Sequence, residues 1–313
     1  MKYLHILNGD ASFDLFRRTS LAGDTLVWRE VLCEGPTIVK VGSDAYWKAR
    51  KDFLISHFPE GAKAHLAQFQ KELSTTDLKA YDEVVLWFEH DLFCQINLLA
   101  VLSWLSESQE TKQRCSWVRV DQLKDYQELT GLGEIDPADY PALLENRQQF
   151  EPHEQLLFAE LWELYCSSNH HELIARSILL NKARFPYLAA ALEKHCQRFP
   201  STKNGLSELE EALLKTIASN SISERQLVGK MLRYDRLYGY GDLQFFNLLQ
   251  GLQSLFFYQE NKLVLNSKGQ QLLNGKAKYQ SVQIESTYYG GASRNDFVWE
   301  SAQQQLLPTE AKK

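Results

Sequence analysis

The sequence predicts an α/β protein with three parts: a doubly wound, mostly parallel sheet with helices, a helical extension, and a smaller C-terminal winged-helix-like domain. Short apolar segments alternate with helical patterns as far as Asp121, which is typical of parallel sheets. After Asp121 the strand signal stops and helical patterns follow one another. Three further helical patterns and a hairpin pattern then suggest a winged helix. We place the three parts at residues 1–125, 126–200 and 201–313.

The centre of the predicted sheet lies at residues 83–105. Residues 83–88 form an apolar run with β-branched and aromatic side chains, as in a strand buried on both faces. From Leu92 the apolar residues fall at helical spacing. The polar residues Glu89, His90 and Asp91 stand between the strand and the helix. Ligands bind at such junctions in open α/β sheets, so we expect a site at this one.

The other elements follow from the same patterns. Further strands are expected at residues 3–7, 25–32 and 115–120, and helices at 11–21, 44–57, 62–73, 137–147, 153–166, 172–180 and 187–198. A linker rich in Pro, Ser, Asn and Gly covers residues 199–205. Beyond it we expect helices at 208–219, 223–232, 242–255 and 267–273, with a hairpin at 256–258 and 262–265. The polar residues after Trp299 are expected to fray.

The composition is that of an ordinary folded protein. It is 44% hydrophobic and 24% charged, with a net charge of −6, which gives no support to wrapping nucleic acid. The five Cys are widely spaced and form no CxxC, so a disulfide framework or a Cys-rich zinc site is not expected. The N-terminus carries no signal-peptide pattern, and the apolar helix is too short to span a bilayer. We therefore expect a cytoplasmic protein without membrane contact.

Several motifs resemble those of the bacterial domain-of-unknown-function family 1835. They are HILNGD at residues 5–10, WREVLCEGP at 28–36, Arg50 and LWFEHDLFCQ at 86–95, with NGL at 204–206 and YGG at 289–291 as C-terminal marks. The clearest part of the resemblance covers about the first hundred residues, where separated motifs occur in the expected order. Some relatives retain a polar residue and the Gln without the His-Asp pair. The resemblance implies a fold but no established activity.

Asn8, Gly9 and Asp10 end the first predicted strand. Gly9 could admit a ligand close to the backbone, and Asp10 could bind a metal ion or a hydroxyl. Alternatively, Asp10 caps the next helix, which is worth about 1 kcal/mol. No GxGxxG or Walker loop is present.

Glu30 and Glu34, with Gly35, follow the second predicted strand. In a parallel sheet they emerge at the same edge as Asp10, where a carboxylate cluster could hold Mg²⁺ or Mn²⁺ or carry out acid–base chemistry. Alternatively, Glu30 points to solvent and Gly35 is a turn residue.

His90 and Asp91 are the sharpest feature of the sequence. Asp91 stands at a helix N-cap, and His90 could act as a base or a metal ligand, or could be an ordinary turn residue. Gln95 lies one helical turn further on and could donate to a ligand. Arg50 could clamp an anion or lie on an exposed helix face. The adjacent residues His170 and His171 are not expected to share a metal ion.

The leading hypothesis is a hydrolase or phosphoryl-transfer site at the carboxyl edge of the sheet, acting on a phosphorylated or nucleotide-like small molecule with a divalent cation. Its catalytic residues would be His90, Asp91, Asp10 and Glu34, and its ligand-binding residues Asn8, Gly9, Glu30, Gly35, Arg50 and Gln95. The alternative is a non-enzymatic module whose winged helix contacts a protein or DNA. DNA is the weaker partner, because the third helix, at residues 242–255, contains no Lys or Arg.

Overall fold

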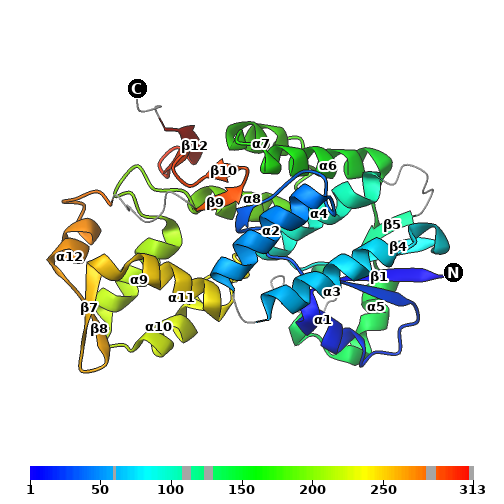
Figure 1. Ribbon diagram of the computed structural model, residues 1–313, viewed down its shortest axis with the longest axis horizontal. Helices are drawn as coiled ribbons and strands as arrows, with labels where there is room; N and C mark the ends of the chain where they lie inside the picture. The colour runs from blue at the N-terminus through cyan, green and yellow to red at the C-terminus, as the bar shows by residue number, and fades with distance from the viewer. Residues whose placement is uncertain (59–60, 108–113, 123–129, 280–286, 310–313) are drawn as a thin grey trace.

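A computed structural model describes residues 1–313 except 59–60, 108–113, 123–129, 280–286 and 310–313 (Figure 1). In this part of the chain, five strands form one sheet in the order β2-β1-β4-β5-β6. They are β1 (Tyr3–Asn8), β2 (Asp24–Trp28), β4 (Glu83–Trp87), β5 (Arg114–Trp117) and β6 (Gln148–Gln149). The first four are parallel and β6 is antiparallel to β5. The predicted α/β class with a mostly parallel sheet is confirmed, whereas β6 is an addition that the sequence patterns do not predict.

The central strand β4 is buried on both faces, as its apolar run predicts. Val84 and Leu86 join a core shared with the helices α2 (Asp44–His57) and α3 (Ala62–Thr75). Val85 and Trp87 face the opposite way, into a second core with α1 (Gly9–Phe16) and α5 (Tyr140–Glu145). Successive side chains of β4 thus point to opposite faces of the sheet, and different helices cover the two faces (Figure 1).

The helix α4 (Leu92–Glu107) follows β4 and packs against α6 (Pro152–Cys166) and α8 (Pro186–Gln197). It is buried on almost every side, because α6 and α8 cover the face that would otherwise meet water. The helix α7 (His170–Ser177) connects α6 to the segment before α8. None of the helices in the described part of the chain combines the length and the apolar content needed to cross a membrane.

The C-terminal elements follow the predicted order. The helices α9 (Glu208–Ser219), α10 (Glu224–Met231) and α11 (Asp242–Gly251) precede the hairpin of β7 (Phe256–Gln259) and β8 (Lys262–Leu265), and α12 (Ser267–Leu273) follows. Ser207 and Glu210 form a capping box at the start of α9. The main hydrophobic core continues from the sheet into these helices. The domain limits stay predictions, and the limit near residue 125 lies outside the described residues.

Two short sheets join distant parts of the chain. The strand β3 (Gly35–Pro36) pairs in parallel with β9 (Tyr288–Gly290), which also pairs with β10 (Ala292–Ser293). The strands β11 (Phe297–Glu300) and β12 (Gln305–Pro308) form a hairpin. The prediction that the residues after Trp299 fray is wrong for β12, because Leu306 packs with Phe199 and Phe297 in a third core. Residues 310–313 lie outside the described part.

Several predicted limits shift by a few residues, and two of the shifts matter for the site. The first helix begins at Gly9 instead of residue 11, which places Asp10 inside its first turn. The second strand ends at Trp28 instead of residue 32, so Glu30 and Glu34 belong to a turn between β2 and β3. Both carboxylates are therefore positioned by that turn and not by the sheet.

Candidate functional site at the carboxyl end of β4

A cavity of about 290 Å³ lies at the carboxyl end of β4, and we call it the β4 pocket. Its walls come from the β4–α4 junction, from the loop before α5, and from the segment that joins α10 to α11. The lining residues are Glu89, His90, Asp91, Gly131, Gly133, Glu134, Met231, Leu232, Asp235, Arg236, Gly239, Tyr240 and Phe245. A cavity therefore lies at the junction where the sequence predicts a site.

Glu89 has the most unusual charge environment in the β4 pocket. Its Oε1 accepts a hydrogen bond of 2.9 Å from the backbone N–H of Leu132. Burial, and then the neighbouring Asp91 carboxyl, raise the pKa of Glu89 to about 7. A carboxyl with such a pKa exchanges its proton near neutral pH, which is what acid–base catalysis requires.

Asp91 caps α4, as the sequence predicts. Its Oδ1 accepts a hydrogen bond of 2.7 Å from the N–H of Cys94. Burial raises the pKa of Asp91 to about 6, although the hydrogen bonds from Cys94 oppose that rise. Gly239 lies against the carboxyl group, so that a Cβ atom there would stand 2.3 Å from Asp91 Cγ. Asp91 is therefore both a cap and part of the pocket wall.

The first N–H groups of α4 are not free to bind a ligand. The N–H of Leu92 donates to Leu237 O at 2.7 Å, and that of Phe93 donates to Tyr238 O at 3.4 Å. The N–H of Cys94 donates to Asp91. Because these donors have partners, the helix end is not a phosphate cradle, and a ligand must bind through side chains.

His90 is buried and its ring lies edge-on to Tyr187, with 6.0 Å between ring centroids. Burial, and then the positive charge of Arg236, lower the pKa of His90 to about 4. The imidazole is consequently neutral at physiological pH, the form that binds a metal ion or accepts a proton. Arg236 also forms an ion pair with Glu134 across the pocket.

Among the described residues, Glu89, Asp91 and Cys94 form a group whose ligand atoms lie within 4.8 Å of one another. Two of these ligands are carboxylate oxygens, which suit Mg²⁺ and Mn²⁺. Burial raises the pKa of the Cys94 thiol, so it stays protonated, and Asn8 Nδ2 donates to its sulfur at 2.8 Å. The oxygen ligands therefore dominate the chemistry of this group.

Asp10, predicted as a catalytic residue, does not reach the β4 pocket. It is exposed on α1, where it forms an ion pair of 2.9 Å with Arg29. Arg29 also contacts Glu72 of α3 at 2.6 Å. These three charged residues link α1 to α3 at the surface. Gly9, just before Asp10, takes a positive φ of 84° with open space around it.

Asn8 and Gln95 lie near the β4 pocket but hold other parts of the protein in place. Asn8 Oδ1 accepts a hydrogen bond of 2.8 Å from Asn97. Gln95 Nε2 donates to Glu89 O at 2.6 Å and so fixes the turn between β4 and α4. Both side chains are buried and neither lines the cavity, so we regard them as positioning residues.

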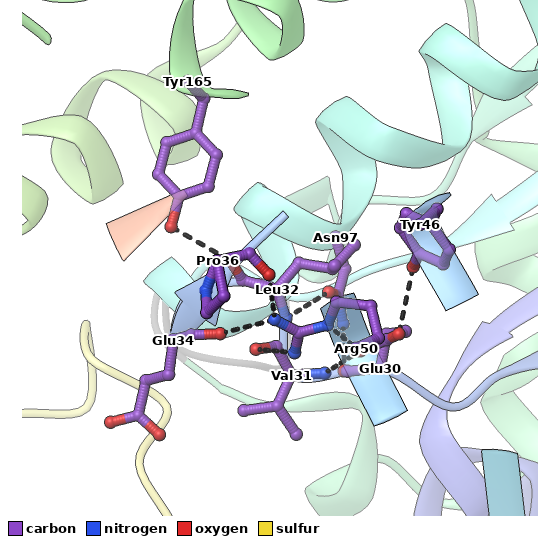
Figure 2. A network of polar contacts seen from close by, with 9 residues as sticks. All are labelled: Glu30, Val31, Leu32, Glu34, Pro36, Tyr46, Arg50, Asn97 and Tyr165. Atoms are coloured by element: carbon purple, nitrogen blue, oxygen red, sulfur yellow. Dashed lines mark hydrogen bonds and ion pairs between the residues drawn. The ribbon is translucent and has the colours of Figure 1, made fainter. Parts of the chain in front are cut away.

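Glu30 and Arg50 form a fully buried ion pair of 3.0 Å (Figure 2). Arg50 also donates to the carbonyl oxygens of Val31, Glu34 and Pro36 at 2.9, 2.8 and 3.0 Å. Because its hydrogen bonds go to this turn, Arg50 is not free to clamp an anion. The alternative that Arg50 lies on an exposed helix face is also wrong, because its side chain is fully buried. The alternative that Glu30 points to solvent is likewise wrong, since Tyr46 Oη donates to it at 3.0 Å inside the core.

Glu34 and Gly35 line another cavity, of about 470 Å³. The β4 pocket is a different cavity, although Tyr240 lines both. The predicted carboxylates thus do not converge in one cleft: Asp91 and Glu34 reach neighbouring cavities, Asp10 is on the surface and Glu30 is inside the core. His170, for which no metal was expected, points inward and contacts His195 at 2.8 Å.

Sequence reasoning missed the residues that close the β4 pocket from the C-terminal part, namely Arg236, Gly239 and Tyr240. The signal available was the tripeptide Tyr238-Gly239-Tyr240, since Gly239 has a φ of 65° and approaches Asp91 closely. The tripeptide alone does not indicate that Gly239 packs against Asp91.

Fold and pocket together define an α/β protein with a parallel sheet and an acidic cavity at the carboxyl end of its central strand. A scan against protein-family models finds no match, and a search of curated proteins finds no similar sequence. The resemblance to family 1835 therefore stays a prediction.

Proposed function

We propose that the β4 pocket is the active site of a hydrolase or phosphoryl-transfer enzyme that acts on a phosphorylated small molecule with Mg²⁺ or Mn²⁺. The residues that would carry out this chemistry are Glu89, His90, Asp91 and Arg236. The five free thiols fit a reducing compartment such as the cytoplasm.

The observation that carries the proposal is the pair of carboxyls in the pocket wall. Glu89 and Asp91 both have raised pKa values, near 7 and 6, because burial disfavours their charged forms, and the Asp91 charge adds to the rise at Glu89. A divalent cation would lower both pKa values again, since it binds the charged form of each carboxyl. Perturbed carboxyls in a cavity at the carboxyl edge of a parallel sheet are typical of functional sites.

The other pocket residues supply complementary chemistry. Neutral His90 can accept a proton from the attacking water and pass it to the leaving group, while Glu89 and Asp91, as carboxylates, would hold the cation. Arg236 is the cation in the pocket wall, and it can bind a phosphate oxygen after its ion pair with Glu134 breaks. A bound cation would polarise the phosphoryl oxygen and lower the pKa of a coordinated water.

The first test is thermal stability at pH 7.5 with Mn²⁺ or Mg²⁺. A cation at about a hundred times its Kd adds about 2.7 kcal/mol of stability, which raises Tm by several degrees. Glu89→Gln and Asp91→Asn should abolish the rise, whereas Asp10→Asn, which changes a carboxyl on the surface, should retain it. Release of phosphate from a panel of nucleotides and sugar phosphates then tests catalysis. If neither cation changes Tm and no substrate loses phosphate faster than with Asp91→Asn, the proposal is wrong.

A second candidate is a binding module that uses the C-terminal helices and hairpin to contact a protein. Leu243 on α11 and Phe257 on β7 are large apolar side chains that are 53% and 48% exposed, so a partner could cover them. A DNA contact is the weaker version, because α11 has no Lys or Arg. Electrophoretic mobility of duplex DNA at low and high salt separates a DNA contact from a protein contact. A DNA contact predicts retardation of the DNA at low salt only, and a protein contact predicts none.

A further inference from the structure

The cavity that Glu34 lines, which we call the Glu34 cavity, lies between the N-terminal and C-terminal parts of the chain. Its volume of about 470 Å³ falls within the range of small-molecule sites. Its walls include the turn with Glu34, the end of α2 with Phe53, α11 with Gln244 and β9 with Tyr289. Glu210 of α9 and Arg294 also line it and form an ion pair with each other. No residue of the proposed catalytic set lies in it.

One polar side chain in this cavity, that of Gln244, lacks a full set of partners. Gln244 is only 6% exposed; its Oε1 accepts from Gly241 N–H at 2.9 Å, but its Nε2 makes no hydrogen bond of good geometry with the described residues. The Glu34 carboxyl lies close enough for Gln244 to lower its pKa, although burial raises that pKa overall. A buried donor without a partner is costly, and a polar ligand would satisfy it beside the partly exposed Glu34 carboxyl.

The backbone at Glu34 is held in place by the Arg50 network. Arg50 binds the backbone carbonyl of Glu34, while the Glu34 side chain extends away from the guanidinium (Figure 2). Gly35 follows with a φ of 75°, and a Cβ atom there would lie 2.4 Å from the Phe53 ring. The backbone of the turn is therefore fixed next to the cavity, and position 35 cannot carry a larger residue.

Aromatic side chains form one part of the wall, and a buried arginine contacts two of them. Arg198 Nη1 donates to Tyr240 Oη at 3.4 Å, and the Arg198 guanidinium stacks 4.2 Å from the centre of the Tyr289 ring. Tyr289 Oη donates back to Arg198 O at 3.4 Å. Rings held in this way offer flat apolar faces to a flat ligand.

We infer that the Glu34 cavity binds a planar heteroaromatic ring that carries two N–H donors beside a carbonyl oxygen, as on the 2-aminolactam edge of a guanine base. The Glu34 carboxylate offers two acceptor oxygens to the donors, and Gln244 Nε2 donates to the carbonyl. The tyrosine rings contact the faces of the heterocycle, whereas the Phe53 ring is already covered by His57 and Arg50. This inference does not depend on the proposed chemistry of the β4 pocket.

Isothermal titration calorimetry with guanosine, inosine and adenosine tests the inference on the full chain. Inosine lacks the 2-amino donor, and adenosine presents a different edge, so we expect guanosine to bind at least about tenfold more tightly than either. Glu34→Gln and Gln244→Ala should each weaken guanosine binding by about tenfold or more. Glu163→Gln, which changes an exposed glutamate of α6, is the matched control and should leave binding unchanged.

Unfolding temperatures of the variants show whether a loss of binding is a loss of fold. Tyr288→Ala provides a further variant, because Tyr288 is partly exposed at the cavity and is less tied to the core. Asp91→Asn should bind guanosine like the wild type, which separates this site from the β4 pocket. The inference is overturned if guanosine shows no saturable binding up to about 1 mM, which corresponds to about −4 kcal/mol. It is equally overturned if inosine binds as well as guanosine, or if folded Glu34→Gln binds like the wild type.

Discussion

Replacing Arg50 by Met should destabilise the protein strongly, because it breaks an ion pair that water does not reach. Arg50 and Glu30 have side chains that are 0% exposed, so Arg50→Met leaves a carboxylate buried without its counter-charge. Breaking a buried pair in this way costs about 3–5 kcal/mol. Three carbonyl oxygens also lose their donor, while Tyr46 Oη and the N–H of Val31 still bind Glu30 and limit the loss. We expect the free energy of unfolding to fall by about 4 kcal/mol.

Urea unfolding followed by tryptophan fluorescence measures this change. The matched control is Arg176→Met, because Arg176 pairs with Glu160 at the surface, where the two side chains are 37% and 42% exposed. That change should cost far less than Arg50→Met, because water screens the surface pair. The double variant with Glu30→Gln and Arg50→Met should be more stable than Arg50→Met alone, because it removes the uncompensated charge. A cost below about 1 kcal/mol for Arg50→Met would refute the reasoning.

Three further outcomes are expected. Folding raises the pKa of Glu89 to about 7, so the folded state holds more protons than the unfolded state between about pH 4.5 and pH 7, and the stability contributed by this carboxyl falls as pH rises through that window. Glu89→Gln should therefore exceed the wild type by about 1–2 kcal/mol at pH 8 and match it near pH 4, as measured by urea unfolding at each pH. Gly239→Ala should lower the free energy of unfolding by about 2 kcal/mol or more, because the new Cβ would clash with Asp91 and residue 239 has a positive φ. Gly229→Ala in α10, where the added Cβ has open space, should be neutral or stabilising. Calorimetry measures both changes. Asp10→Ala should change the unfolding free energy by less than about 1 kcal/mol, since Asp10 is 51% exposed; a larger loss would mean that the Arg29 contacts matter more than their exposure suggests.

The regular elements of the fold were largely predictable because they follow from local patterns. The limits of α2, α9 and α12 match the predicted residues, since each helix combines an apolar stripe with a capping residue at its start. The short strand β6 was not predictable, because two glutamines carry no strand signal and pair with β5 only through tertiary contact. The strands β9 and β3 are similar cases.

The candidate site was predictable in part. Glu89, His90 and Asp91 stand out in the sequence because a strand changes to a helix there, and that change is visible in the period of the apolar residues. The sequence did not show where the side chains of Asp10 and Glu30 would lie. They depend on Arg29 and Arg50, whose side chains arrive from other elements to form ion pairs. A carboxylate next to a strand end can face a ligand or a protein cation, and only the packing of distant segments decides between them.

The parallel pairing of β3 with β9 brings Gly35 beside Tyr289. One wall of the Glu34 cavity is thus made early in the chain and the facing wall very late, so a growing polypeptide cannot complete the cavity until nearly all of the described residues have left the ribosome. Contacts between such distant residues close a long loop and tend to form slowly. A chain interrupted before β9 would keep its five-stranded sheet while leaving Glu34 open to water.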